Sequence, residues 1–291
     1  MSATERRRVR VGLIGTGIGG SLSPAMHEAA GAANGLDYSY ERFDLAGAAD
    51  PDAALKASLD EAEGRGFAGV NVTHPFKQAV IDHLHALSPE AQALGAVNTV
   101  VFGHGRRTGH NTDCTGFARG FSGQLSDAAL HEVVQLGAGG AGLAVAHALL
   151  TLGTERLTLV DRQPTRSAAA GRALAERFGK SRIQVADDPA EALATADGLV
   201  NATPVGMAAY PGIPLRQELL RPSLWVADVV YVPLDTELLQ AARAMGCRVC
   251  DGGGMAVFQA VEAFELFTAI APDSRRMQAH FAELTGNVPA T

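Results

Sequence analysis

The stretch that decides the fold is Val133-Val-Gln-Leu-Gly-Ala-Gly-Gly-Ala-Gly-Leu-Ala-Val-Ala-His-Ala-Leu-Leu150. Its apolar start predicts a short buried strand, its glycines a turn and its apolar end a helix. The glycines fit G-x-G-x-x-G, a spacing that permits a tight turn, close approach of the backbone to a pyrophosphate and close packing of helix on strand. The N–H groups at the helix start then face the phosphates. We predict a dinucleotide site formed by Gly137, Ala138, Gly139, Gly140, Ala141 and Gly142.

The next apolar run, Arg156-Leu-Thr-Leu-Val-Asp161, strengthens this interpretation. It predicts a second strand that ends in an acid about 20 residues after the last glycine, where a carboxylate can accept hydrogen bonds from ribose hydroxyls. The alternative, glycines that only pack a strand against a helix, explains the turn but not the acid.

Composition excludes several classes of protein. The chain has 291 residues, of which 47% are hydrophobic and 19% charged, so it can form a globular core. The net charge of -7 argues against nucleic acid or an anionic membrane as a partner. No apolar run approaches the length of a membrane span, and the amino terminus lacks the apolar segment of a secretory signal. We expect a cytoplasmic protein.

The cysteines and lysines are few. Three cysteines do not suggest a disulfide framework. Cys247-Arg-Val-Cys250 lies in a predicted strand, where residues three apart point to opposite faces, so we expect a structural role and no metal. Only three of the 24 basic residues are lysines, Lys56, Lys77 and Lys180. A lysine retained in such a chain is a candidate for chemistry, because lysine can lose its proton and arginine cannot.

A second glycine motif, Gly15-Thr-Gly-Ile-Gly-Gly20, follows the predicted first strand and competes as a dinucleotide site. No apolar helix follows it directly, because Ser21-Leu-Ser23-Pro24 intervenes. The next strand, expected over 38–44, does not end cleanly in an acid at the right distance. We therefore expect this loop to present the hydroxyls of Ser21 and Ser23. The alternative is that Ser23 only caps the helix that starts at Pro24.

The remaining pattern is a succession of strands and helices that predicts an α/β fold with a mostly parallel sheet. We expect helices over 52–65 and 76–87, strands over 67–73 and 95–102, a polar connection over 106–113 and a helix from Asp113. A second succession, 113–254, contains the glycine fingerprint, and Gly252-Gly-Gly254 is expected to be a flexible joint. The prediction is a two-lobe architecture: a substrate domain, 1–112, onto which helices of 255–291 pack, and a Rossmann domain, 113–254, with a cleft between them.

Taken together, these stretches resemble the shikimate dehydrogenase family from about Val11 to Leu266. The family's Ser-x-Ser-Pro is residues 21–24, its N-V-T-x-P-x-K residues 71–77 and its G-A-V-N-T residues 95–99. Its N-T-D is residues 111–113, its N-A-T-P-x-G-M residues 201–207 and its D-x-V-Y-x-P-x-x-T residues 228–236. Several independent motifs stand in the family's order.

The resemblance implies an oxidoreductase that interconverts shikimate or quinate and the 3-keto form with a nicotinamide cofactor. Ser21 and Ser23, assisted by Tyr231, would hold the substrate carboxylate, and Thr73, Asn98 and Gln259 would bind ring hydroxyls. Lys77 and Asp113 would form the catalytic pair. The cofactor would also contact Asp161, Arg166, Thr203, Val229 and Gly252.

The catalytic pair makes chemical sense. Hydride leaves the ring carbon as the hydroxyl proton departs, so an acid/base group must lie within hydrogen-bond reach. Burial lowers the pKa of a lysine and a nearby carboxylate raises it, so such a pair is poised for proton transfer. Which member accepts the proton stays open. His74 and His110 are alternative bases that we rank below Lys77, because loop histidines often have no catalytic role.

The cofactor prediction depends on Asp161, where NADP-using members usually have Asn-Arg-Thr. A carboxylate there would repel a 2′-phosphate, which favours NAD, whereas Arg162 and Arg166 keep NADP open. The pattern resembles the NAD-linked quinate/shikimate branch. An NADP-linked biosynthetic enzyme, an aminoshikimate-type relative, a folate-type dehydrogenase and a catalytically silent sensor remain alternatives. We expect a monomer or homodimer.

Overall fold

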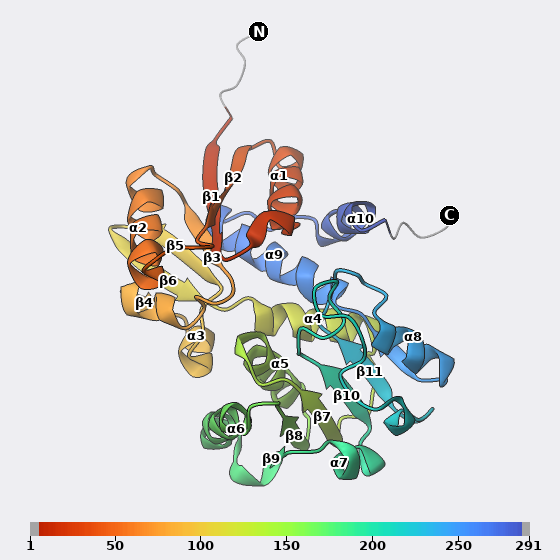
Figure 1. Ribbon diagram of the computed structural model, residues 1–291. Helices are drawn as coiled ribbons and strands as arrows, with labels where there is room; N and C mark the ends of the chain where they lie inside the picture. Colours follow the sequence, from red (N-terminus) through yellow and green to blue (C-terminus); the bar gives the residue numbers. More distant parts are fainter. Residues whose placement is uncertain (1–5, 287–291) are drawn as a thin grey trace. The chain divides into compact units, whose positions relative to one another are not determined.

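The computed structural model describes residues 6–286, and the chain divides into two compact units (Figure 1). Within the described residues, unit 1 holds those up to Thr112 and those from Gln259 onward, and unit 2 is Asp113–Phe258. Each unit is an α/β structure built on a six-stranded sheet, which confirms the predicted fold class. None of the helices in residues 6–286 is long and apolar enough to cross a membrane.

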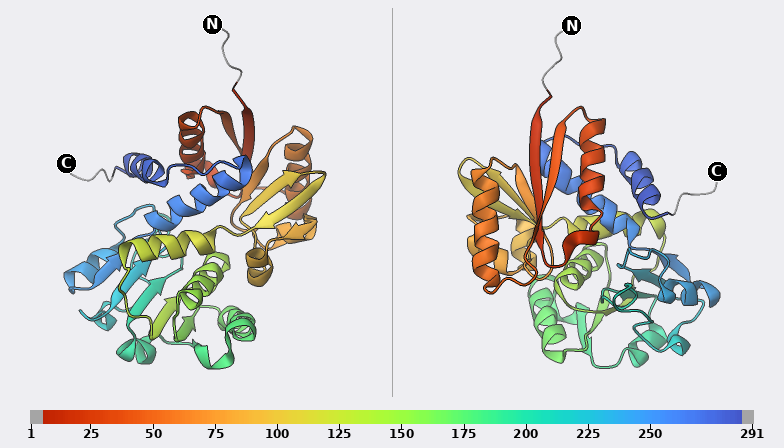
Figure 2. Two further views of the ribbon diagram at one scale, coloured as in Figure 1. Left: turned by 180° about the vertical axis from the view of Figure 1, so that it is seen from behind. Right: turned by 45° about the horizontal axis from the view of Figure 1, so that its top comes forward.

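The sheet of unit 1 has the order β2-β1-β3-β5-β6-β4. β1 pairs in parallel with β2 and β3, whereas β5 runs antiparallel to both β3 and β6 (Figure 2). The carboxyl ends of β1 and β3 and the amino end of β5 therefore share one edge of the sheet. The bounds are β1 Arg8–Gly15, β2 Asp37–Asp44, β3 Gly69–Val72, β4 Ala86–Leu87, β5 Thr99–Gly103 and β6 Arg106–His110.

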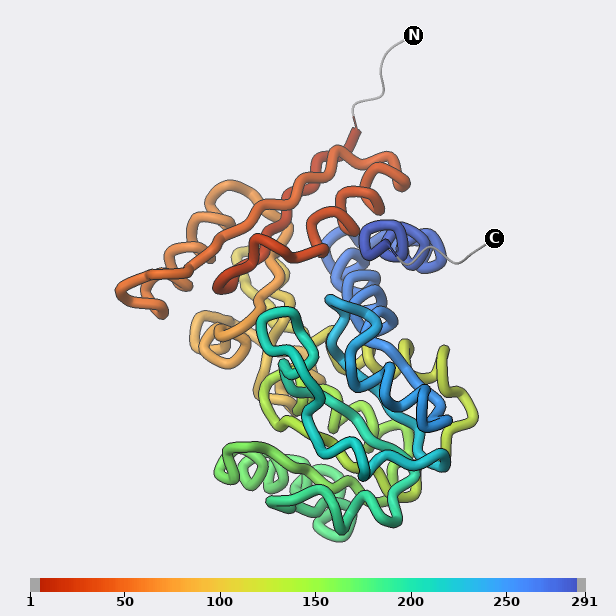
Figure 3. Tube along the Cα trace, turned by 45° about the vertical axis from the view of Figure 1, so that its right-hand side comes forward, coloured from red at the N-terminus to blue at the C-terminus, as the bar shows by residue number. Residues whose placement is uncertain are grey.

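The two faces of this sheet are covered by different helices. Because side chains alternate along a strand, Val70 and Val72 of β3 pack in one apolar core with Leu55 and Leu59 of α2. On the other face Gly69 leaves room for Phe267 of α9. Helix α10 lies beside α1 (Figure 3). The helices are η1 Ile18–Gly20, α1 Ser23–Ala33, α2 Pro51–Gly64, η2 Ala79–His83, α3 Pro89–Leu94, α9 Gly253–Thr268 and α10 Ser274–Leu284.

The helix expected over 76–87 is wrong. The chain forms turns up to Gln78, then the short 3-10 helix η2 and the strand β4. The carbonyl of Lys77 accepts from the N–H of Val97 at 2.7 Å, so it is directed to another segment rather than to the next helical turn. A contact so distant in sequence overrides the local helical pattern.

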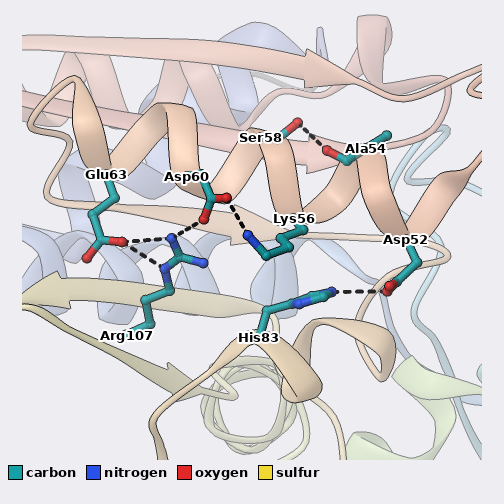
Figure 4. Close-up of polar contacts among 8 residues, drawn as sticks. All are labelled: Asp52, Ala54, Lys56, Ser58, Asp60, Glu63, His83 and Arg107. Carbon is teal, nitrogen blue, oxygen red and sulfur yellow. Dashed lines mark hydrogen bonds and ion pairs between the residues drawn. The ribbon is translucent and has the colours of Figure 1, made fainter.

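The polar connection expected over 106–113 is also wrong in part, because β6 forms there. Arg107, only 8% exposed, donates from Nε to Glu63 at 2.9 Å and from Nη2 to Asp60 at 2.6 Å, and Asp60 also pairs with Lys56 (Figure 4). Two carboxylates of α2 thus compensate a buried guanidinium on an otherwise polar strand.

The sheet of unit 2 is entirely parallel, with the order β12-β11-β10-β7-β8-β9. The chain moves outward from β7 in one direction to β9 and in the other to β12, so β7 borders the point where strand order reverses. Ligands of open parallel sheets bind at that point, beyond the carboxyl ends of the strands. The bounds are β7 Glu132–Leu136, β8 Arg156–Val160, β9 Ile183–Ala186, β10 Gly198–Asn201, β11 Trp225–Asp228 and β12 Arg248–Cys250.

Helices also cover this second sheet. Leu193 of α7 and Leu238 of α8 pack in one core with Leu199 of β10 and Val226 of β11, while α4 packs against α5. The helices are α4 Asp113–Gln124, α5 Gly140–Thr151, α6 Pro164–Phe178, η3 Lys180–Arg182, α7 Ala190–Thr195, η4 Gln217–Leu219 and α8 Glu237–Ala244.

The flexible joint expected over 252–254 is wrong. A Cβ on Gly252 would lie 2.5 Å from the carbonyl oxygens of Val229 and Val230, and one on Gly254 would lie 2.7 Å from Cα of Gly120. These glycines permit close backbone packing, and α9 begins at Gly253.

Candidate active site

The two serines predicted to bind the substrate carboxylate, Ser21 and Ser23, follow the glycine loop after β1. Ser21 and Ser23 are both half-buried. The Ser21 Oγ accepts from the N–H of Ser23 at 3.3 Å, and the Ser21 carbonyl accepts from Arg42 at 3.2 Å. Ser23 is the first residue of α1 and its side chain makes no capping bond, because Leu22 occupies the cap position. The alternative that Ser23 only caps the helix is therefore wrong.

The glycine loop before these serines is held by Asp44, an acid to which the sequence assigned no role. β2 does end in an acid, Asp44, whose carboxylate accepts from the N–H groups of Gly17 at 2.9 Å, Ile18 at 3.2 Å and Ala46 at 3.0 Å. These bonds, led by the one from Gly17, hold the pKa of Asp44 below its ordinary value. The N–H groups of Gly17 and Ile18 are thus used within the protein.

Thr73 and Lys77 lie at the same edge of the sheet as this loop. The N–H of Thr73 donates to the carbonyl of Ile14 at 2.9 Å, and the Thr73 methyl group lies where a Cβ on Gly15 would approach to 2.4 Å. Lys77 follows within one run of turns and is half-buried. Lys77 is thus neither fully exposed nor at the start of a helix.

Asn98 completes this edge at the amino end of β5. It is 4% exposed, and its Oδ1 accepts from the N–H of Thr112 at 2.9 Å and from the hydroxyl of Thr99 at 3.0 Å. Its Nδ2 donates to the hydroxyl of Thr112 at 3.0 Å. Thr112 directly precedes Asp113 in the chain, so the same bonds restrain the backbone that leads to that carboxylate.

The other residues predicted in unit 1 have different positions. Gln259 is half-buried on α9, the helix whose Phe264 and Phe267 pack around His27. His74 is exposed and contributes its carbonyl to the N–H of Thr16. Burial lowers the pKa of His110, opposed by the charge of Glu90.

Unit 2 contains the glycine fingerprint in the predicted strand–turn–helix context. Gly137 has φ of 92°, and a Cβ there would lie 2.7 Å from the carbonyl oxygen of Ala202. The buried Gln135 holds the turn by donating from Nε2 to the carbonyls of Gly137 and Gly142, each at 2.8 Å. Helix α5 begins at Gly140 after the cap residue Gly139, with no capping side chain. Its first N–H groups therefore have no partner within the helix and suit a phosphate.

Asp161 directly follows β8 and contacts the glycine fingerprint. Its Oδ2 accepts from the N–H of Ala138 at 2.8 Å, and its Oδ1 accepts from the N–H of Gln163 at 2.8 Å. Nη1 of Arg166 lies 3.9 Å from the same Oδ2. A negative charge at this position is suited to ribose hydroxyls, and the neighbouring arginine offsets part of it.

Thr203 also borders the fingerprint. Its methyl group would be 3.0 Å from a Cβ on Gly137, and its hydroxyl donates to Oδ1 of Asn201 at 2.7 Å. Asn201 in turn donates to Asp228 at 2.9 Å, and the hydroxyl of Thr236 donates to the same carboxylate at 2.8 Å. Burial raises the pKa of Asp228 to about 6.

Asp228 also holds the loop that carries the predicted residues Val229 and Tyr231. Its carboxylate accepts from the N–H of Val230, and Val229 contacts Gly252 through its carbonyl. Burial, and then the charge of the Asp113 carboxylate, raise the pKa of Tyr231. Within unit 2, then, Asp113 acts electrostatically on the tyrosine. Asp113 is 6% exposed in the first turn of α4.

The cysteine pair shows only structural contacts. Cys247 and Cys250 are buried, and burial raises the pKa of both thiols, that of Cys250 to about 12. Cys247 donates to the carbonyl of Arg221 at 3.2 Å. Among the described residues no group of His, Cys, Asp and Glu is arranged to hold a metal ion.

Sequence reasoning missed the residues that support the site. Asn71 and Thr99 lie inside the quoted motifs but received no role, and Asp44, Asp228 and Thr236 received none either. The available signal was polarity inside short strands predicted to be buried. Such side chains must form hydrogen bonds, and their partners reveal what they hold in place.

Comparison with known proteins identifies the relatives of this chain. Residues 13–100 match the family model described as shikimate dehydrogenase substrate binding domain. The chain is 59% identical to a shikimate dehydrogenase (NADP(+)) of Streptomyces avermitilis, over 95% of this chain and 96% of the relative. It is 49% identical to a quinate/shikimate dehydrogenase (NAD(+)) of Corynebacterium efficiens, over 95% and 98%.

A solved structure agrees. Quinate dehydrogenase from Corynebacterium glutamicum in complex with NAD superposes with a TM-score of 0.90 and 46% identity, covering 96% of this chain and all of the other. The resemblance found in the motifs is thereby confirmed, together with the prediction of an NAD(P)-dependent oxidoreductase. The chain belongs to the shikimate dehydrogenase family.

Proposed function

We propose that this protein is an NAD-dependent dehydrogenase that reversibly oxidises shikimate, quinate or both at a ring hydroxyl to the 3-dehydro form. The observation that carries the proposal is that Thr73, Lys77 and Asn98 lie at one edge of the unit 1 sheet, where β1 ends in the loop before Ser21. The hydroxyls of Ser21 and Ser23 at the start of α1 suit a small carboxylate, and the threonine and asparagine suit ring hydroxyls.

In this proposal, Lys77 and Asp113 form the acid/base pair. A bound nicotinamide supplies the hydride acceptor. Lys77 Nζ and the Asp113 carboxylate hold and move the hydroxyl proton, which must leave the substrate oxygen as the carbon–hydrogen bond breaks. Tyr231 acts beside Asp113 in unit 2, as the raised pKa of its phenol supports. Gln259 is proposed as a further ligand of the ring.

The test is Lys77→Ala, with Lys56→Ala as the matched control. Lys56 is an exposed lysine of α2 paired with Asp60, so its loss removes an equal charge away from the proposed site. We expect Lys77→Ala to lower kcat by roughly 10²–10⁴-fold while the dissociation constant for NAD is unchanged. Asp113→Asn should act in the same direction. Near-normal turnover by Lys77→Ala would overturn the assignment, and tight ligand binding by an inactive wild type would indicate a sensor.

The preference for NAD rests on Asp161. Its carboxylate lies at the fingerprint through the Ala138 bond, where it would bind ribose hydroxyls and repel a 2′-phosphate. Gly137, Gly139, Gly140, Ala141, Gly142, Thr203, Val229 and Gly252 are proposed to line the same cofactor site. Arg166 and the NADP-linked relative support the competing candidate, an NADP-linked shikimate dehydrogenase.

Steady-state kinetics with each acid against NAD and NADP separates these candidates. We expect a kcat/KM for NAD at least about tenfold above that for NADP, and Asp161→Ala should reduce the difference. A higher kcat/KM for NADP in the wild type would favour the competing candidate.

A further inference from the structure

A chain of buried polar side chains crosses the sheet of unit 1 behind Asn98. The hydroxyl of Tyr40 on β2 donates to Oδ1 of Asn71 on β3 at 2.7 Å. Nδ2 of Asn71 donates to Oγ1 of Thr99 at 2.9 Å, and the Thr99 hydroxyl donates to Oδ1 of Asn98 at 3.0 Å. Each of the four residues is at most 7% exposed, so solvent does not compete for these bonds.

Backbone groups fix the orientation of both amides in this chain. The Asn98 carbonyl, which can only accept, lies 3.3 Å from one terminal atom of Asn71, so that atom is the Nδ2 group. The N–H of Thr112, which can only donate, lies 2.9 Å from one terminal atom of Asn98, so that atom is Oδ1. The Thr99 hydroxyl receives a hydrogen from Asn71 and must pass its own to Asn98.

These bonds determine which atom of the Asn98 side chain can bind a substrate. Its Oδ1 accepts two hydrogen bonds from the protein, from Thr99 and Thr112, which uses both lone pairs of a carbonyl oxygen. We propose that Tyr40 and Thr99 are positioning residues that hold the Asn98 carboxamide as a hydrogen-bond donor, so that the ring oxygen it meets must accept. This inference rests on the proposed function, in which Asn98 binds the substrate ring.

The energetics favour a role beyond packing. Without the Thr99 hydroxyl, Oδ1 of Asn98 would lose one of its two donors and Nδ2 of Asn71 would lose an acceptor, so the side-chain amide of Asn98 would depend more on its bonds to Thr112. A less restrained amide would present its N–H to the ring oxygen in a poorer geometry, which weakens substrate binding. Tyr40 acts one step further away, so its loss should have a smaller effect.

The experiment compares four variants with the wild type. Thr99→Val removes the relay hydroxyl and Thr99→Ser restores it. Tyr40→Phe removes the first donor. Tyr38→Phe is the matched control, because Tyr38 lies on the same strand and its hydroxyl forms a hydrogen bond with His27. For each, kcat and KM for shikimate and quinate, the dissociation constant for NAD and the midpoint of thermal unfolding are measured.

We expect KM to rise about tenfold in Thr99→Val and about threefold in Tyr40→Phe, with kcat within about twofold and NAD binding unchanged. Thr99→Ser and Tyr38→Phe should keep the wild-type KM. An active wild type whose KM is unaffected by Thr99→Val and Tyr40→Phe, even if their thermal midpoints fall, overturns this inference alone. A wild type inactive with both acids overturns the proposed function as well.

Discussion

The two units contain the same glycine spacing after a strand, but the N–H groups of the two loops have different partners. Loop 1, residues 15–20, follows β1, and loop 2, residues 137–142, follows β7. In each unit, the next strand in the sequence is also a neighbour of the first in the sheet. An acid stands at the carboxyl end of that strand, Asp44 in β2 and Asp161 directly after β8. Each carboxylate accepts from the N–H of a residue inside its loop.

The two loops differ in the hydrogen-bond partners of their N–H groups. In loop 1, the N–H groups of residues 16, 17 and 18 all donate to protein oxygens, and residues 18–20 form the 3-10 helix η1. In loop 2 the helix α5 begins inside the loop, at Gly140, so the first N–H groups of the helix have no partner within it. The glycine spacing alone does not predict a phosphate site, because an immediate helix start decides whether donors remain for an anion.

The glycines of the two loops also differ in how closely other atoms pack against them. A Cβ on Gly137 or Gly142 would meet backbone atoms at 2.7 or 2.4 Å, whereas one on Gly17 or Gly20 would have no atom within 4 Å. Loop 2 is thus a tightly packed turn, and the central part of loop 1 is an open one.

The largest expected effect is that of Gly142→Ala. Its Cβ would lie 2.4 Å from the carbonyl oxygen of Gly137, so the turn must shift, and we expect a loss of about 3 kcal/mol in the free energy of unfolding. The dissociation constant for NAD should rise about a hundredfold, because the helix start moves with the turn. Thermal unfolding and cofactor titration measure both quantities.

Gly20→Ala is the matched control in loop 1, with open space around its Cβ. We expect a change within about 0.5 kcal/mol in the free energy of unfolding and no change in NAD affinity. Equal losses in the two variants would show that the loops are not packed differently and would remove the basis of the comparison.

The helix that follows loop 1 gives unit 1 a second distinctive property, sensitivity to acid. His27 of α1 is 1% exposed among Tyr38, Tyr40 and the phenylalanines of α9, and burial lowers its pKa to about 3. The unfolded chain binds a proton near pH 6.5 and the folded chain does not, so stability falls as the pH drops below that value. The expected loss is roughly 3 kcal/mol by about pH 4.

His27→Gln should flatten this part of the stability–pH curve, measured by denaturant unfolding at a series of pH values. His104→Asn, a change at an exposed turn residue, should leave the curve as it is. If the wild type and His27→Gln lose the same stability on acidification, then His27 is not the group responsible.

In unit 2, protonation of Asp228 should raise the free energy of unfolding as the pH falls, the opposite of the effect of His27. Burial raises its folded-state pKa to about 6, above the ordinary value of 3.8, so the folded chain binds a proton first. Its contribution is therefore fully present below pH 3.8 and is lost as the pH rises through about 6. Relative to Asp228→Asn, the wild type should gain roughly 2 kcal/mol between about pH 7 and pH 4. A constant difference between the two proteins over this range contradicts the prediction.

Local patterns in the sequence were sufficient for the fold class, the fingerprint and most strands. They failed where a distant partner decides the structure. The Lys77 carbonyl bonds to Val97, and Arg107 finds its carboxylates on α2, contacts that no periodicity indicates.

The candidate site shows the same division. Motif spacing predicted roles for Ser21, Lys77, Asn98 and Asp161, because chemistry constrains those residue types. The acid at the end of β2 was judged by its distance from a glycine, whereas its actual role is to bond the loop amides. Which buried polar groups support a site depends on pairing across strands, and that is visible only in the folded sheet.

The smallest expected effects separate the two loop carboxylates. Asp44→Asn leaves an amide oxygen that accepts fewer bonds than the three that the carboxylate accepts, so loop 1 should loosen and move Ser21 and Ser23. We expect KM for the ring acid to rise about threefold with NAD affinity unchanged, whereas Asp161→Asn should weaken NAD about fivefold and leave KM for the acid unchanged. Both constants come from one set of steady-state measurements. If Asp44→Asn weakened NAD binding instead, loop 1 would be part of a nucleotide site. The distinction between loop amides that bond to the protein and loop amides that bind an anion would then be wrong.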